Sequence, residues 1–297
     1  MQRVLHLEGL TISSITETIP TAAAPERATV VVRPAGNWPE IGLAELWSFH
    51  ELFWFLVWRD LKVRYRQTLL GVLWVVLQPL MTMAVFAVVL GKLVGVPTDG
   101  IPYPLFAYTG LLPWMFFSSA VATGAVCMVG NSNLITKVYF PRILLPAAAV
   151  TARLVDFIVG SLGLVALLIY YRVPVTSGFL FIPLAVVVEL IFAIAISAVF
   201  ANFHVRFRDI AFIVPVALQL GMFVTPVVYR WTLVPERWRW LIMANPMTGI
   251  VEMYRSALIG WSMPWKPFAV SAIAAMVMIA VALFESRRTE GALADIV

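Results

Sequence analysis

Long apolar runs separated by short polar stretches dominate the chain from about residue 69 to residue 285. A helix crosses about 30 Å of hydrocarbon with roughly 20 apolar residues. Helices are expected rather than strands, because backbone N–H and C=O groups in lipid must be paired within their own segment. Six runs approach the required length: residues 69–93, 104–128, 147–171, 178–201, 210–229 and 267–285. The chain is therefore predicted to be an all-α integral membrane protein with six transmembrane helices.

An aromatic and basic segment, residues 43–66, precedes the first apolar run. Helical spacing separates its rings from its cations: Trp54, Trp58, Leu61 and Tyr65 share one face, Arg59, Lys62 and Arg66 share another, and Arg64 is a fourth cation. This pattern is typical of an amphipathic helix in the membrane surface, with rings among the headgroups and cations facing lipid phosphates. A cytoplasmic extension of the first span would produce the same pattern, so both interpretations stand here.

The stretch between the last two runs, residues 230–266, contains two semi-apolar pieces, WRWLIMAN and MTGIVEMYRSALIGW. Each piece is too short or too charged to cross a membrane. We expect short re-entrant helices that dip into the outer leaflet; a plain solvated loop is the alternative. Irregular backbone at that depth must face protein or a water-filled path, so such helices would suit a gate at the outer mouth of a pathway.

Basic residues flank the apolar runs unevenly, and Lys and Arg accumulate near spans on the cytoplasmic side. With the start inside, six spans place ten cations in the cytoplasm: Arg59, Lys62, Arg64, Arg66, Lys137, Arg142, Arg206, Arg208, Arg287 and Arg288. Seven cations then lie outside, and five of these fall in residues 230–266, which weakens the rule for the last spans. Both termini are expected in the cytoplasm, residues 1–42 as an extension and residues 287–297 as a tail.

Composition excludes several classes of protein. Hydrophobic residues make up 61% of the chain and charged residues 12%, whereas a soluble domain carries about 25% charged residues. Cys127 is the single cysteine and the three histidines are scattered, so no disulfide or Cys/His metal site is predicted. The phosphate-binding pattern GxxxxGK[ST] is absent, and the cations flank apolar runs instead of forming a nucleic-acid surface. We expect no cofactor, no ATP hydrolysis by this chain alone and no nucleic-acid partner.

Three ionisable residues fall inside predicted spans: Arg153, Asp156 and Glu189. A charge at the centre of a transmembrane helix costs about 2.5–3.5 kcal/mol on insertion scales. Arg153 and Glu189 lie about six and eleven residues from the approximate starts of neighbouring, oppositely directed spans, so we expect them at similar depth, where they could neutralise each other. Asp156, one turn from Arg153, could share that cation. A buried pairing that sets helix register and a proton or ion relay both remain open, with the pairing favoured.

Aromatic residues make up 13% of the chain, and several fall in the first two predicted spans. Aromatic belts at the membrane interfaces account for many such rings. A second interpretation is that some rings line a pathway and stack on sugar rings, which would hold a polymer without locking it. The candidate lining residues are Trp74, Tyr108, Trp114, Phe116 and Phe117.

The cytoplasmic loop NSNLITKVYFPRILLP, between the second and third spans, mixes aromatic and basic side chains. Exposed aromatics beside Lys and Arg resemble the anchors of a protein–protein interface. Ordinary juxtamembrane anchoring explains the same composition. The candidate interface residues are Lys137, Tyr139, Phe140, Pro141 and Arg142.

Seven short motifs follow one another along the chain: RDLKVRYRQTLLGVLWVVLQPL, VFAVVLGKLVG, GLLPWMFFSSA, NSNLITKVYFPR, FRDI, TPVVYR and NPMTGIVEMYR. In this order they resemble the membrane subunit of polysaccharide-exporting ABC-2 transporters, over roughly residues 45–285. Members of that family export O-antigen, capsular polysaccharide or teichoic acid. The resemblance implies that residues 67–286 form an ABC-2 transmembrane domain in the bacterial inner membrane.

The resemblance also implies the partners. Two copies of the membrane subunit would work with two separately encoded ATP-binding cassette subunits, which would bind ATP and Mg. A lipid-linked polysaccharide would pass between the two copies, and Arg59, Lys62, Arg64 and Arg66 could attract its pyrophosphate as well as membrane lipids. Residues 131–142 would form the coupling helix that docks on the ATPase, and the re-entrant helices would lie within 236–260. The extension 1–42 departs from the family pattern.

Three other functions share parts of this sequence pattern. An ABC-2 permease for a lipid or drug would have the same architecture with less aromatic lining. An integral-membrane glycosyl or acyl transferase should show clustered carboxylates or histidines at one membrane face, and the sequence shows none. A passive channel would not need a loop that docks on an ATPase.

Overall fold

The computed structural model describes residues 43–66 and 73–293. The predicted extension 1–42, residues 67–72 at the start of the first predicted span, and residues 294–297 of the tail lie outside the described residues. Every regular element within the described ranges is a helix. The prediction of an all-α protein is therefore confirmed.

Five helical segments are long and apolar enough to cross a membrane. They are Leu73–Val94 (α3, Leu73–Phe86, continued by a π-helical segment, Ala87–Val94), Tyr103–Gly130 (α4), Leu144–Tyr170 (α6), Ser177–Arg206 (a 3-10 turn, Ser177–Phe181, then α7, Ile182–Arg206) and Trp265–Arg288 within α11 (Trp265–Leu293). They match five of the six predicted spans, with ends displaced by a few residues.

The remaining predicted span, 210–229, corresponds to α8 (Ile210–Val224), which is apolar but only 15 residues long. At 1.5 Å per residue such a helix reaches about 22 Å, short of the hydrocarbon thickness. It ends at Thr225 because Pro226 follows, and a residue before proline is pushed to the extended conformation that Thr225 adopts. The count of six spans stays a prediction.

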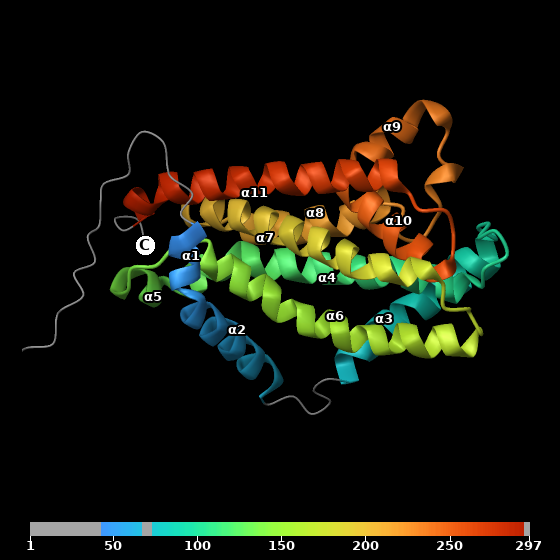
Figure 1. Ribbon diagram of the computed structural model, residues 1–297, viewed down its shortest axis with the longest axis horizontal. Coiled ribbons are helices and arrows are strands. Elements are labelled where there is room, and N and C mark those ends of the chain that lie inside the picture. The colour runs from blue at the N-terminus through green and yellow to red at the C-terminus, as the bar shows by residue number, and fades with distance from the viewer. Residues whose placement is uncertain (1–42, 67–72, 294–297) are drawn as a thin grey trace, which may run out of the picture. The chain divides into compact units, whose positions relative to one another are not determined.

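Helix α4 is the centre of the bundle, packed against α6 on one side and α7 on another, and α7 in turn packs against α11 (Figure 1). Its close contact with α7 depends on Gly124, where an added Cβ would lie 2.6 Å from Ser197 Oγ. Small residues at such crossings let helix backbones approach closely. The buried core therefore runs along α4.

Residues 43–65 form two helices, α1 (Leu43–Ser48) and α2 (His50–Tyr65), instead of the single predicted helix. Leu56 and Val57 of α2 are buried against the start of α6, while Trp54 and Trp58 are 59% and 66% exposed. Helix α2 is thus held to the bundle by one apolar face and turns its tryptophans outward. Figure 1 shows α1, α2 and the short helix α5 (Ser132–Lys137) near one end of the long helices.

The predicted short helices between the last two spans are present as α9 (Glu236–Ala244) and α10 (Pro246–Ile259), at the other end of the long helices (Figure 1). Asn245 separates them: its side-chain oxygen accepts a hydrogen bond from the Met247 amide at 3.1 Å, and its Nδ2 donates to Thr225 Oγ1 at 2.8 Å. Helix α10 is almost wholly buried against α4, α7 and α11. It is not a solvated loop; that it re-enters the bilayer stays a prediction.

Candidate functional site

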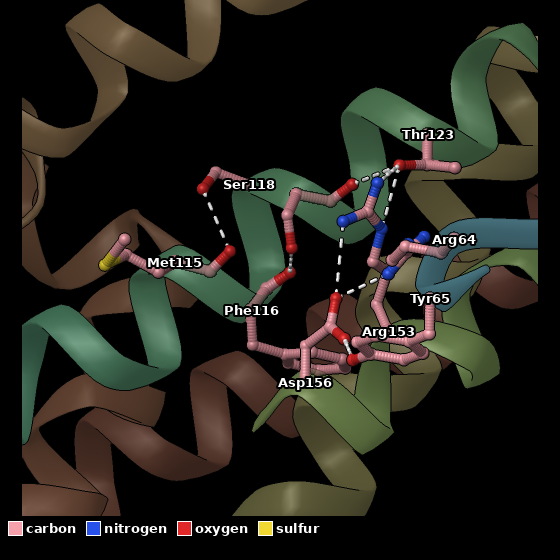
Figure 2. Close-up of polar contacts among 9 residues, drawn as sticks. Arg64, Tyr65, Met115, Phe116, Ser118, Thr123, Arg153 and Asp156 are labelled. Carbon is pink, nitrogen blue, oxygen red and sulfur yellow. Dashed lines mark hydrogen bonds and ion pairs between the residues drawn. The ribbon is translucent and has the colours of Figure 1, made fainter. Parts of the chain in front are cut away.

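A cluster of charged side chains joins α2, α4 and α6 (Figure 2). The Asp156 carboxylate accepts hydrogen bonds from Arg64 Nη1 at 2.5 Å and from the Tyr65 hydroxyl, and pairs with Arg153 Nη1 at 3.3 Å. Arg153 also donates to Thr123 Oγ1 from Nε and Nη2, at 3.1 and 2.6 Å. These five residues, from three helices, define the charged cluster.

The local sequence explains how these groups meet. Arg153 and Asp156 are three residues apart on α6, so their side chains lie on one helical face. Arg64 and Tyr65 lie at the end of α2, whose apolar face packs on α6. Packing of α2 on α6 therefore places the Arg64 guanidinium beside the Asp156 carboxylate, which is already paired with Arg153.

The cluster holds two guanidinium groups and one carboxylate, so its contacts leave one positive charge in excess. The side chains of Arg64, Arg153 and Asp156 are 23%, 25% and 16% exposed, and charges at this depth are screened less by salt than surface charges. Burial and the hydrogen bond to Asp156 raise the pKa of Tyr65 to about 12. Tyr65 therefore remains a neutral hydrogen-bond donor at physiological pH.

The charged cluster forms part of the wall of a cavity of about 540 Å³ between α2, α3, α4, α6 and α8. Five aromatic residues line the cavity together with Arg64, Arg153 and Asp156: Tyr65, Trp74, Trp114, Phe116 and Phe157. The cavity thus offers cations, a carboxylate and aromatic rings to whatever enters it.

The five aromatic candidates are distributed over three environments. Trp74, Trp114 and Phe116 line the cavity just described. Phe117 lines, with Trp114, a separate apolar cavity of about 390 Å³ between α4, α7 and α8. Tyr108 is fully buried in the core, where its hydroxyl donates to the Gly160 carbonyl at 2.9 Å. The structure therefore gathers three of the five around one space.

The expected pairing of Arg153 with Glu189 is wrong. Glu189 is fully buried and accepts a hydrogen bond from the Tyr254 hydroxyl of α10 at 2.9 Å. Counting residues from each span's start placed the two groups at equal depth, but the starts lie at opposite ends of antiparallel helices. At 1.5 Å per residue Arg153 lies about 13 Å along α6 from Leu144, and Glu189 about 25 Å along α7 from Arg206. Asp156 shares the Arg153 cation, as the one-turn spacing predicted.

The four cations of α2 are not equivalent. Arg64 belongs to the charged cluster, whereas Arg59 pairs with its neighbour Asp60 at 2.9 Å. Lys62 and Arg66 are exposed. Only Arg64 of the four lines the cavity within the described residues.

The predicted ATPase-docking residues divide into an exposed and a buried set. Lys137, at the end of α5, is exposed, and Tyr139 is 48% exposed. Phe140, Pro141 and Arg142 are buried; Phe140 packs against Leu56 and neighbouring residues at the start of α6. Lys137 and Tyr139 are therefore the members placed to contact another protein, and the other three hold the turn in place.

One buried ion pair escaped the sequence prediction, which assigned Arg255 to an outer loop. Arg255 is fully buried in α10, pairs with Glu252 at 2.6 Å, and lies with its guanidinium carbon 4.0 Å from the centre of the Phe106 ring. It also donates to the carbonyls of Pro226 and Val227, at 3.2 and 2.7 Å. The available signal was an acid and a base three residues apart within an otherwise apolar stretch. This arginine ties the end of α8 to α10.

The described residues contain no group of three or more His, Cys, Asp or Glu side chains placed to hold a metal ion. The charged cluster offers recognition through hydrogen bonds and charge. Arginine suits such recognition, because its planar guanidinium matches the oxygens of phosphates and carboxylates.

Several known proteins are similar in sequence to this chain. A family profile described as ABC-2 type transporter matches residues 51–259, which include the whole charged cluster. The chain is similar to the "O-antigen export system permease protein RfbA" of Myxococcus xanthus, at 36% identity over 83% of this chain and 96% of the relative. A Klebsiella pneumoniae protein with that description is 27% identical over 76% and 86%. The "Polysialic acid transport protein KpsM" of Escherichia coli is 22% identical over 67% and 78%.

Proposed function

The chain belongs to the ABC-2 type transporter family, and from this premise we propose that it moves a lipid-linked, O-antigen-like polysaccharide across the cytoplasmic membrane. Its role is that of the permease subunit, driven by a separate ATP-binding subunit. The observation that carries the proposal is the cavity in which two arginines and five aromatic residues meet. Similarity to proteins named for O-antigen export and polysialic acid transport supports a polymeric saccharide as cargo.

The cavity matches the two chemical parts of such a cargo. A pyrophosphate on a lipid carrier is a dense anion, which the excess positive charge of Arg64 and Arg153 favours. A sugar ring has a flat C–H face, which the ring of Trp74, 51% exposed, can stack against. Cation and rings in one space thus favour a lipid-linked saccharide over a purely apolar drug or lipid.

We place the end of the bundle that carries α2 and α5 in the cytoplasm, with α9 and α10 outside. The cations of α2, Lys137 of α5, Arg206 at the end of α7 and Arg287 in the last turns of α11 belong to segments at the end with α2 and α5. Lys and Arg are expected to gather on the cytoplasmic side in this way. Exposed Trp54 and Trp58 on α2 suit the headgroup layer beside it. A lipid-linked substrate would then meet Arg64 at the cytoplasmic membrane surface.

A path for the polymer requires a second copy. Helices α3 and α8 flank the cavity and bury little of their surface: Pro79 is the buried residue of α3, and Val214 that of α8. Apolar helices that remain so exposed can face lipid or another protein. We assign these two helices to the contact between two copies, so that the cavities of both face a shared path.

Deleting the gene in the source organism tests the cargo. The expected result is lipid-linked polysaccharide accumulating inside the cells and lost from their surface, with export restored by the wild-type gene. Normal surface polysaccharide with a defect in drug resistance or lipid distribution would instead support the rival permease function.

Two variants test the cavity in the same cells. Arg64→Gln should lower export, because it removes cavity charge, whereas Arg59→Gln should not, because Arg59 pairs with Asp60 outside the cavity. Arg64 and Arg59 both lie on α2, and each substitution removes one positive charge from the membrane surface. Equal effects of the two variants, at equal protein levels, would contradict a specific role for the cavity.

A further inference from the structure

A second polar cavity, of about 630 Å³, lies where α10, the loop before η3 (Trp231–Leu233) and the start of α11 meet. Its wall includes Asp99, Arg230, Trp231, Trp261, Trp265 and Lys266. None of these residues belongs to the cavity between α3 and α8. The two cavities are therefore separate sites on the chain.

The charged groups of this second cavity are held in fixed positions. Arg230 forms an ion pair with Asp99, and its guanidinium carbon lies 4.3 Å from the centre of the Trp261 ring. The Arg230 side chain is 19% exposed, whereas Asp99 is 56% exposed. Trp261 supports the arginine, the arginine orients the carboxylate, and the carboxylate retains free hydrogen-bonding capacity toward the cavity.

Two further tryptophans supply aromatic surface. Trp265 is 50% exposed and is contacted edge-on by Phe181, with ring centres 5.1 Å apart at 88°. Trp231 lies on another segment of the wall, is partly buried, and has the guanidinium carbon of Arg239 5.8 Å from its ring centre. Because half of the Trp265 side chain is exposed beside this contact with Phe181, aromatic surface remains available to a ligand.

A pyranose has an apolar C–H face and a rim of hydroxyl groups. Indole rings match the face, and a carboxylate beside a guanidinium and an ammonium group matches the rim, as donors and acceptors converge on the same space. The volume falls within the range of about 300–1,000 Å³ common for small-ligand sites. We propose that this cavity is a saccharide-binding subsite that holds one or more sugar units of the exported polymer, an inference that rests on the proposed function.

The competing explanation is a membrane-interface belt, because five of the eleven tryptophans fall within residues 231–265. In a membrane-interface belt, all of these tryptophans would have the same role. The structure distinguishes them: Trp238 and Trp240 lie on α9, are 49% and 65% exposed, and do not line the cavity. They provide matched controls for Trp231 and Trp265.

The test measures saccharide binding to the full chain, purified with its ATP-binding subunit in lipid nanodiscs. The probe is a set of short oligosaccharides, released by mild acid from the surface polysaccharide of cells that carry the gene. Titration calorimetry gives the number of sites per chain and their affinity. Trp265→Ala should remove one site or weaken it about tenfold or more, and Trp265→Phe, which keeps a ring, should restore most of the affinity.

The controls separate the possible outcomes. Trp238→Ala and Trp240→Ala should bind within about twofold of wild type; losses equal to that of Trp265→Ala would overturn the subsite in favour of a belt. Unchanged binding in both Trp231→Ala and Trp265→Ala would also overturn it, as would no binding by wild type. The proposed function fails separately, when cells lacking the gene show normal surface polysaccharide.

Discussion

At the scale of single residues, the charged cluster depends on Asp156. This carboxylate is the shared acceptor of Arg64, Tyr65 and Arg153, which come from two helices. Removing a buried charge leaves its partners desolvated and unpaired. This penalty in folding free energy usually exceeds the net stabilisation that the ion pair contributed. Asp156 therefore fixes both the end of α2 and the charge that faces the cavity.

Replacing Asp156 by Asn should destabilise the protein by about 1–3 kcal/mol, because two partly buried guanidinium groups lose their anion. Thermal unfolding of the purified chain in detergent measures the change. Asp60→Asn is the matched control: it removes a carboxylate paired only with neighbouring Arg59 in the described contacts, and should cost at most about 1 kcal/mol. Equal losses in the two variants would argue against a structural role for the cluster.

Glu189 is the second residue whose role the structure narrows. Its carboxylate accepts a hydrogen bond from the Tyr254 hydroxyl, and no other titratable side chain is hydrogen-bonded to it within the described residues. A glutamine at this position would still offer an oxygen to Tyr254. The contact therefore suits a structural link between α7 and α10 better than a proton relay.

Glu189→Gln is accordingly expected to keep both the protein level and the export rate near wild type. Export of surface polysaccharide, normalised to the amount of protein in the membrane, measures this. Loss of export at a normal protein level would instead establish that an ionisable group is required at this position. Tyr254→Phe, which deletes the donor, separates loss of the hydrogen bond from loss of the carboxyl group.

At the scale of elements, α5 and the turn after it form an exposed projection built on a buried base. Phe140 and Arg142 are 3% and 9% exposed, whereas Tyr139 is 48% exposed. A rigid base with a protruding tip is suited to transmitting movement from a partner. The proposed ATPase contact is therefore confined to Lys137 and Tyr139.

Charge reversal at Lys137, combined with Tyr139→Ala, should uncouple ATP hydrolysis from export, because it changes the exposed tip and spares the buried base. ATPase activity and polysaccharide export are measured on the same complexes. Lys92→Glu, a charge reversal at an exposed site near the other end of the bundle, serves as control. Preserved coupling in the Lys137 variant would place the ATPase contact elsewhere on the chain.

At the scale of the whole molecule, one copy of the bundle leaves two of its apolar helices thinly packed. Residues Phe212 and Leu220 of α8 are 77% and 62% exposed. The cavity with the charged cluster lies between α8 and α3. Contact between two copies along these helices would cover the apolar surface and enclose the cavity.

Single cysteines introduced at Phe212 or Leu220, in a Cys127→Ala background, should cross-link two copies in native membranes. Ile273→Cys is the control, since Ile273 on α11 is 64% exposed and belongs to a helix outside the proposed contact. Dimer bands on a denaturing gel measure the result. Cross-linking through Ile273 without any through α8 would assign the contact to the opposite helices.

The sequence by itself determined which segments are helices and which of them are long and apolar enough to cross a membrane. Partition between water and lipid is a property of each segment, so a long run of apolar residues indicates a transmembrane span wherever it lies in the chain. The same local logic predicted the short helices α9 and α10, and the spacing of Arg153 and Asp156 predicted their shared face. Even the short α8 has a local cause, Pro226.

Only the tertiary structure decided which side chains from different helices meet. Arg64 reaches Asp156 because α2 packs on α6, and Glu189 meets Tyr254, instead of Arg153, because α10 folds back against α7. Such contacts join residues 65 to 92 positions apart, and their geometry depends on how helix surfaces interlock. Helix formation and membrane insertion are local and additive, whereas pairing between helices is neither, and the candidate cavities are products of that pairing.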